Sequence, residues 1–455
     1  MARSSAPPPR PAEPGRAPAP STVAAIASSI AVLAIATVLT KSFALGKELV
    51  LASTFGTASS LEAYLLALVV CNFLIGLVAH SLPTAFVPVL VRQLEHGRVA
   101  AARALVTGTT VIAVGAGLVC ALAIALSSGT LADLLGGGFE PATRELAAEL
   151  LFRLAPVVPL AGLGSVLGAI LHARRRFWAV SLVPACTPIA IVIALLLGDA
   201  DVELLTTATI CGALAEAVLL GILVARAGLL VPRWPGLHDP ELREVIRGYV
   251  PLLLGAAVLG LVPVCDRAIA ATVGAGGVAT LAYAGRLVDP LLATGATAIG
   301  TAMLPHAARS LAQGGRELRG VSVRLGALVL ATSVPLVVGL VLGSHTIVKL
   351  LFARGAFTEA DAAAVAGVQA VLALQIPIYL VGMIAARVLA AAGRVRVLVL
   401  GNLAALVLTV VLDLALVDGF GVRGIAIATV VMRTITVGWL LFACLRALRL
   451  REAQP

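Results

Sequence analysis

The chain has 455 residues, of which 60% are hydrophobic and 12% are charged, with a mean hydropathy of +1.06 and a net charge of +10. Soluble globular domains carry about twice this charged fraction, so the composition excludes that class and predicts a polytopic, all-α membrane protein. The basic excess does not indicate nucleic-acid binding, because the arginines fall in short loops between apolar runs, where they mark topology.

Taken in order, the chain starts with a Pro-rich tail, residues 1–21, which we expect to be disordered and cytoplasmic. A helix needs about 20 residues to cross the hydrocarbon core. On this basis we expect about twelve transmembrane helices, at 22–53, 61–91, 102–129, 148–171, 177–198, 203–226, 247–271, 277–308, 322–347, 362–390, 396–416 and 422–445. Alternate loops are rich in arginine, which predicts that both termini, including a tail at 447–455, are cytoplasmic.

An internal repeat divides these helices into two lobes. The pattern Pro-x3-Arg-x-Leu-x2-Gly at 88–97 recurs 217 residues later at 305–314, and the Ala-Tyr pair at 63–64 recurs 219 residues later. Six helices bring the repeat back in the same orientation, so we expect parallel repeats: an N-lobe at 22–226, a cytoplasmic linker at 227–246 and a C-lobe at 247–446. A binding site between such lobes is typical of an alternating-access transporter.

Charged residues inside the apolar helices form the candidate binding site. An ionised side chain that faces lipid costs roughly 2.5 to 3.5 kcal/mol, so we expect them to face an interior cavity. They are Lys41, Lys47, Glu48, Glu62, Asp266, Arg267, Arg286 and Asp289. Arg286 and Asp289 are three residues apart and can pair on one helix face. Cations at this depth suit a phosphate-bearing ligand, whereas the aromatic content of 4% is low for a drug-export cavity.

Several stretches carry a family resemblance. The segments LPTAFVPVLVRQLEHG (82–97), LAYAGRLVDPLL (281–292) and LFARGAFTEADA (351–362) resemble the MurJ (MviN) lipid II flippase family of the multidrug/oligosaccharidyl-lipid/polysaccharide (MOP) exporter superfamily. The resemblance runs from about residue 35 to 430. It implies a MATE-like fold in the bacterial inner membrane and a flippase that turns a lipid-linked pyrophosphoryl sugar from the inner to the outer leaflet for peptidoglycan synthesis.

The resemblance also assigns residues and partners. The essential helix-1 arginines of the family fall on Lys41 and Lys47, its helix-2 acid on Glu62 and its helix-8 arginine on Arg286. The implied partners are a lipid-linked anionic glycan, membrane lipids and cell-wall synthesis proteins.

The sequence departs from the family pattern in helix 2 and at the C-terminal end. The family's basic pair and following acid are replaced by Ile75-Gly76 and the Ala79-His80 region, which makes His80 a candidate replacement cation. Two further C-terminal helices of the family have no counterpart here. A related undecaprenyl-linked glycan is therefore the alternative substrate to lipid II.

A second constellation concerns a coupling ion. Thr409 and Asp413 are four residues apart on one helix face, and Thr429 and Asp266 lie in helices 12 and 7. Their oxygens are hard ligands of the kind that alkali cations use. The MurJ family, which this sequence resembles, has a proposed sodium site among the same three helices. The resemblance therefore implies Na⁺ or H⁺ as the coupling ion, and we expect no other cofactor.

Two other function classes remain open at this point. The chain contains no HExxH, GxSxG or DxDxDG motif, so we expect a protein that is not an enzyme. A drug or organic-cation antiporter of the same superfamily would depend on Glu62 but not on Lys47 or Arg286. A membrane scaffold for cell-envelope synthesis would tolerate removal of the cavity charges.

Overall fold

The structure is a computed structural model that describes residues 20–452, except 175, 200, 229–233, 235, 237–238 and 313–315. Within these ranges it consists of helices and contains no strand. The predicted tail at 1–21 lies outside the described residues, apart from Pro20 and Ser21, which begin the first helix.

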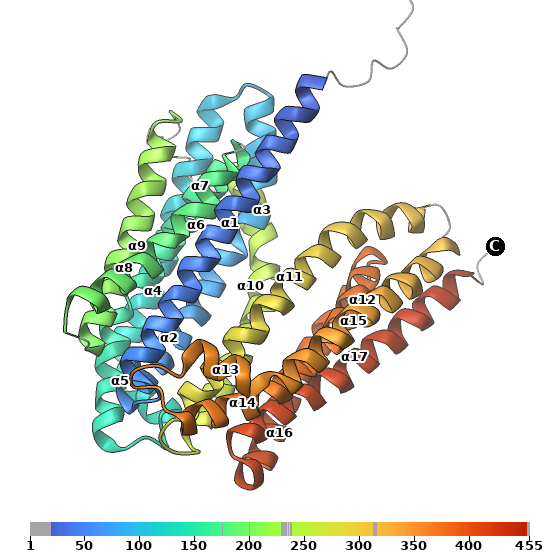
Figure 1. Ribbon diagram of the computed structural model, residues 1–455. Helices are drawn as coiled ribbons and strands as arrows, with labels where there is room; N and C mark the ends of the chain where they lie inside the picture. Colours follow the sequence, from blue (N-terminus) through green and yellow to red (C-terminus); the bar gives the residue numbers. More distant parts are fainter. Residues whose placement is uncertain are drawn as a thin grey trace, which may run out of the picture.

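Two groups of helices are connected by one long helix, α10 (Pro240–Ala271) (Figure 1). The first group consists of α1 (Pro20–Phe55), α2 (Ser59–Ile75), η1 (Gly76–His80), α3 (Leu82–Glu95), α4 (Val99–Leu135), α5 (Pro141–Leu154), α6 (Val157–Ala173), α7 (Phe177–Leu182), η2 (Val183–Ala185), α8 (Cys186–Leu197) and α9 (Val202–Ala225). The second consists of α11 (Gly277–Ala312), α12 (Arg316–Leu342), α13 (Ser344–Phe352), α14 (Glu359–Ala373), α15 (Gln375–Ala391), α16 (Val395–Phe420) and α17 (Val422–Glu452). We call these groups the first half and the second half.

Ten helical segments in the described residues are long and apolar enough to cross a membrane. The predicted spans 22–53 and 277–308, which correspond to α1 and α11, are not among these ten segments. These two helices carry Lys47, Glu48 and Arg286. Other spans are interrupted: 61–91 contains α2, the π-helical turn η1 and α3, and 362–390 contains α14 and α15.

The boundaries near the linker and the C-terminal end differ from the prediction. Helix α10 already begins at Pro240, inside the predicted linker, because the Asp239 carboxylate accepts hydrogen bonds from the backbone N–H groups of Glu241 (3.0 Å) and Leu242 (3.2 Å). Helix α17 continues to Glu452, so most of the predicted tail at 447–455 is helical.

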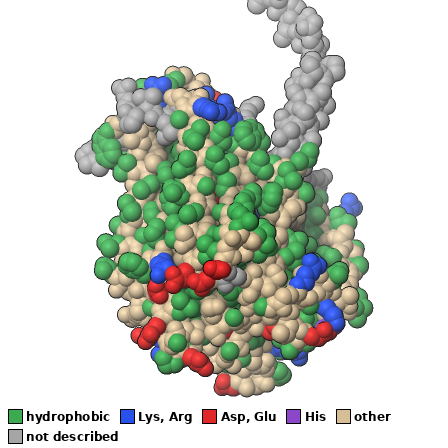
Figure 2. All heavy atoms as spheres, turned by 60° about the vertical axis from the view of Figure 1, so that its left-hand side comes forward, with side chains coloured by type: hydrophobic (Ala, Val, Ile, Leu, Met, Phe, Trp, Pro, Cys, Tyr) green, Lys and Arg blue, Asp and Glu red, His purple; other side chains and the backbone are tan. Residues whose placement is uncertain are grey.

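The exposed surface is largely apolar, as expected for a membrane protein. Many large apolar side chains are exposed on the helices, for example Leu126, Leu197 and Leu342, each more than 80% exposed. Figure 2 shows that the apolar side chains cover much of the surface and that Asp and Glu gather toward one end of the molecule. A soluble protein would not leave so much contiguous apolar surface in water.

The two halves are joined at one end and separate toward the other (Figure 1). At the joined end, which is the end away from the chain termini, one buried core includes Leu61 and Tyr64 of α2 together with Tyr283 of α11 and Phe352 of α13. A second buried core lies toward the terminal end, and its members, such as Phe86, come only from the first half and α10. The two halves therefore share a core only at the joined end.

Candidate functional site

Glu48 of α1 forms one ion pair across to Arg286 of α11 and a second with its neighbour Lys47. One of its carboxylate oxygens, Oε1, lies 2.8 Å from Lys47 Nζ and 3.2 Å from Arg286 Nε. The Glu48 side chain is 10% exposed, whereas those of Lys47 and Arg286 are 17% and 37% exposed. Three of the residues predicted from the sequence thus meet in one cluster, which lies between the two halves.

The charge of this cluster is positive overall. Arg267 of α10 and Asp289 of α11 act electrostatically on its members. Asp266 in turn acts on Arg267, and Arg433 acts on Asp289, so four cations face three carboxylates in and around the cluster. Arg286 acts electrostatically on Asp289, as their spacing allows, but in the described part of the chain its ion pair is with Glu48 on the other half. An excess of positive charge in a partly exposed site is suited to an anion.

Glu62 lies apart from this cluster and binds the start of α11. Its carboxylate accepts hydrogen bonds from the backbone N–H groups of Gly276 (2.8 Å), Val278 (2.7 Å) and Ala279 (3.3 Å). Free N–H groups and the helix dipole make a helix N-terminus attractive to a carboxylate. Because Glu62 is only 1% exposed and both of its oxygens are occupied, it holds the two halves together at the joined end.

Further polar and aromatic contacts close the joined end. The Thr57 hydroxyl donates to Asp361 Oδ1 (2.7 Å), and the Tyr283 hydroxyl donates to the carbonyl oxygen of Gly56 (3.1 Å). The Tyr283 ring also lies 5.4 Å from the ring of Phe352. The two hydrogen bonds link the first half to α11 and α14, and the ring contact packs α11 against α13 beside them, so together they form a seal.

The remaining predicted substrate residues are placed differently. Lys41 is exposed on α1, and in the described part of the chain it makes no ion pair. Six residues, or about 9 Å of helix, separate it from Lys47. His80 is the last residue of η1, and its side chain lies outside the described residues.

The four residues of the predicted ion site come from α10, α16 and α17. Thr409 and Asp413 are fully buried, and Asp266 lies close enough for the two carboxylates to influence each other. Asp266 Oδ1, Thr409 Oγ1 and both carboxylate oxygens of Asp413 have no hydrogen-bond partner, and the Thr429 hydroxyl donates to Ile425 O (3.0 Å). Buried carboxylates without a partner are costly. The set of oxygens therefore fits a bound cation or proton.

Sequence reasoning missed three charged side chains. Arg433 of α17 donates from Nε to Gln375 Oε1 (2.5 Å), and its guanidinium carbon lies 4.7 Å from the centre of the Tyr379 ring. Arg387 of α15 has a buried Nε without a hydrogen-bond partner, and Glu216 of α9 lies inside the first half. The signal that identified Lys47, a lone charge in an apolar helix, was present for each of them.

A family model described as "Lipid II flippase MurJ" matches residues 51–454. A probable lipid II flippase MurJ from Vibrio cholerae is 27% identical over 344 residues, which are 71% of this chain and 65% of that protein. A probable lipid II flippase MurJ from Synechocystis is 28% identical over 428 residues, or 89% of this chain and 79% of the relative.

Solved structures share the fold. A structure titled "Lipid II flippase MurJ, inward closed conformation" matches with a TM-score of 0.75 at 19% identity and covers 92% of this chain and 89% of its own. An inward-facing multidrug resistance MATE family transporter of the MOP superfamily matches with a TM-score of 0.78 at 16% identity, covering 94% of this chain and 100% of its own. At these identities the likeness describes the architecture.

Proposed function

Because the chain belongs to the lipid II flippase MurJ family, we propose that it carries a lipid-linked pyrophosphoryl sugar, lipid II or a related undecaprenyl-linked precursor, from the inner to the outer leaflet by alternating access. The observation that carries this proposal is the cluster of Lys47, Glu48 and Arg286, which joins α1 to α11 and has an excess of positive charge.

The chemistry of this cluster suits a pyrophosphate. A guanidinium has five donors, and the ion pair with Glu48 engages only Nε of Arg286, which leaves its terminal nitrogens for a phosphate oxygen. Lys47 adds a compact ammonium on the facing helix. Glu48 holds both cations in place while the site is empty, and the entering phosphate takes over part of this role.

The distribution of charge supports an orientation in the bacterial inner membrane. Exposed arginines at the terminal end include Arg98, Arg174, Arg176, Arg226, Arg243, Arg247, Arg394 and Arg396. Exposed acids at the joined end include Glu140, Glu145, Asp199, Glu203, Glu359 and Asp418. By the positive-inside rule the terminal end and both termini are cytoplasmic, so this conformation is inward-facing.

The joined end is then the outer gate. Opening it requires that Glu62 leave the first N–H groups of α11 and that Thr57 separate from Asp361. Substrate binding between the halves and release of this seal are the two events that alternating access must link.

The ion site provides a means of coupling. Asp266 and Asp413, with the hydroxyls of Thr409 and Thr429, would hold Na⁺ or H⁺, whose positive charge would offset one of the two adjacent carboxylate charges and relieve their repulsion. These residues lie on α10, α16 and α17. The distances between them would therefore change if α10 moved relative to α16 and α17.

The test is complementation of a bacterial strain depleted of its own lipid II flippase. The wild-type chain should restore growth, and Arg286→Ala should abolish growth at an equal protein level in the membrane, because the pyrophosphate loses its bidentate partner. Arg98→Ala, which removes an exposed arginine outside the cluster, is the matched control and should complement. Full complementation by Arg286→Ala would overturn the proposed site.

A further inference from the structure

A cavity of about 470 Å³ lies within the first half, away from the cluster between the halves. It is bounded by α2, α3, α6, α8 and α9, with contributions from η1, α7 and η2. Its volume is in the range of small-molecule sites, which are typically apolar cavities with a few polar groups. No step of the proposed flipping mechanism uses it.

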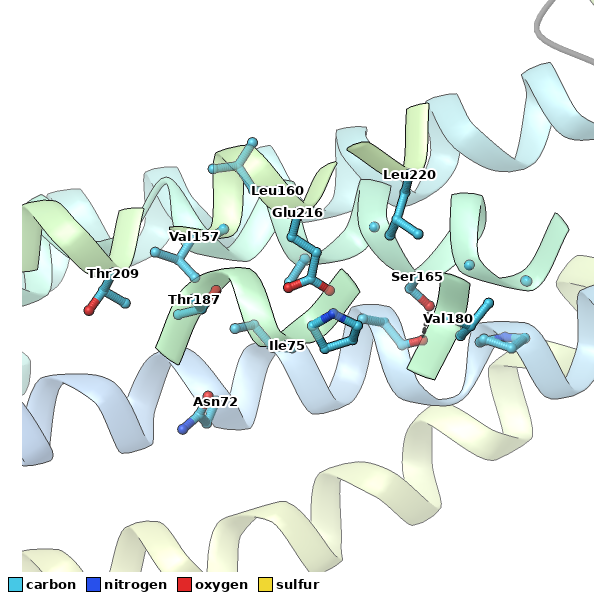
Figure 3. A pocket seen from close by; sticks show the side chains of 18 of the residues that line it. Asn72, Ile75, Val157, Leu160, Ser165, Val180, Thr187, Thr209, Glu216 and Leu220 are labelled. Atoms are coloured by element: carbon cyan, nitrogen blue, oxygen red, sulfur yellow. Dashed lines mark hydrogen bonds between the residues drawn. The ribbon is translucent and has the colours of Figure 1, made fainter. Parts of the chain in front are cut away.

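Glu216 of α9 places a carboxylate in this cavity. Figure 3 shows the side chain projecting from its helix into the space between Thr187 and Ser165. In the described part of the chain, the Glu216 carboxylate forms no ion pair and no hydrogen bond, and no cationic side chain acts on it. The polar group at the centre of the cavity is therefore available to a ligand.

Glu216 lies near the middle of α9, far from both ends of the helix, and this position makes its carboxylate, unpaired among the described residues, notable. The residue is 14 positions after the start of α9 and 9 positions before its end, so at least about 13 Å of helix separates it from either end. A carboxylate so far along an apolar helix is rare and is usually functional, because it is costly unless it faces a cavity or a partner.

The walls of the cavity define the chemistry of the ligand. Leu68, Ile75, Leu160 and Val180 supply apolar surface, and the glycines of α6 leave the room that side chains would otherwise fill. Asn72, on the α2 side, is exposed, so the cavity is accessible. A proton or a metal ion alone would not need so large an apolar volume.

We propose that this cavity is a second binding site, which takes a lipophilic monovalent organic cation whose charge pairs with Glu216 while its apolar groups fill the space between α2, α6 and α9. The site is independent of the pyrophosphate cluster. A ligand held there would lie inside the first half and would not span the two halves, so its binding does not require Arg286.

The test is equilibrium binding of tetraphenylphosphonium to the purified full chain in phosphatidylcholine nanodiscs, with empty nanodiscs as background. We expect saturable binding by the wild type and a loss of affinity of about tenfold or more in Glu216→Gln, since the buried charge pair is lost. Glu203→Gln is the matched control: it removes a carboxylate from the same helix, but this one is exposed and paired with Arg153, so affinity should not change.

A second variant tests the volume without removing the charge. A Cβ at Gly164 would lie 3.9 Å from Leu220 Cδ1 and 4.0 Å from Glu216 Oε1, both ordinary contact distances, so Gly164→Ala should fold and should weaken binding by narrowing the cavity. Arg286→Ala should bind the cation as the wild type does, which separates this site from the flippase site. Absence of saturable binding by the wild type, or equal affinity in the wild type and Glu216→Gln, would overturn the proposal.

Discussion

Replacing Glu62 by Gln should loosen the joined end. The carboxylate accepts hydrogen bonds from three backbone N–H groups at the start of α11, and among the described residues only Gly276 donates to Oε2. Gln retains an oxygen in place of Oε1, but its NH₂ group then faces the Gly276 N–H, and two donors repel each other. The substitution keeps the size of the side chain and removes its negative charge.

The expected magnitude follows from these contacts. Loss of one charge-assisted hydrogen bond costs about 1.5 to 3 kcal/mol, and loss of the charge at the helix N-terminus costs about 0.3 to 2 kcal/mol. Together they amount to about 2 to 5 kcal/mol, which shifts the ratio of closed to open joined ends by about 30-fold to 4,000-fold.

The assay measures the distribution of distances between two spin labels, one on each side of the joined end. Glu145→Cys and Asp418→Cys place the labels on α5 and α16, where both side chains are exposed, in a background from which the native cysteines have been replaced. Glu62→Gln should increase the population at long distances without substrate, whereas Glu140→Gln, at another exposed acid, should not. Identical distance distributions for Glu62→Gln and the parent would refute the role assigned to Glu62, since a residue that only binds substrate would not move the empty protein.

Two further predictions concern the seal and the ion site. Gly56→Ala should lower the thermal unfolding temperature more than Gly97→Ala: both glycines have positive φ (+55° and +69°), which costs an L residue about 1 to 2 kcal/mol, but only at Gly56 would the new Cβ also collide with the Ala356 carbonyl group. Equal decreases would argue against close approach of the halves at this turn. Asp413→Asn should remove any rise in unfolding temperature produced by NaCl relative to choline chloride, because a ligand at 100 times its dissociation constant stabilises by about 2.7 kcal/mol. Asp418→Asn, on the same helix but exposed, should keep that rise, and a sodium effect that survives in Asp413→Asn would place the ion elsewhere.

Composition and spacing predicted the helical membrane fold well, because the hydrocarbon core imposes length and polarity on each span. They also selected Lys47, Glu48 and Arg286, because charge in an apolar helix is conspicuous in a sequence. The breaks within spans were harder to predict. Residues 76–81 keep the apolar character of a continuous helix, yet the structure contains a π turn there, and the hydroxyl of Tyr249 on α10 donates to two of its carbonyl oxygens.

The partners of the charges were not predictable in the same way. Arg286 and Asp289 are neighbours on one helix, so local spacing favoured their pairing, but the partner of Arg286 is 238 positions away in the sequence. The acceptor role of Glu62 depends on backbone N–H groups more than 200 residues away, and no residue type marks such groups. Pairings between the two halves follow from how the halves pack, which a single sequence does not encode in any local pattern.

Helix α10 determines how the molecule can deform. Its early residues, among them Leu242 and Tyr249, are buried against the first half, and its late residue Asp266 lies beside Asp413 of α16. Between these attachments lie about 17 residues, or roughly 25 Å of uninterrupted helix, in which Pro251 and Pro263 each remove one backbone hydrogen bond. Under the proposed alternating access, these two breaks in the hydrogen-bond ladder would let α10 bend as the angle between the halves changes.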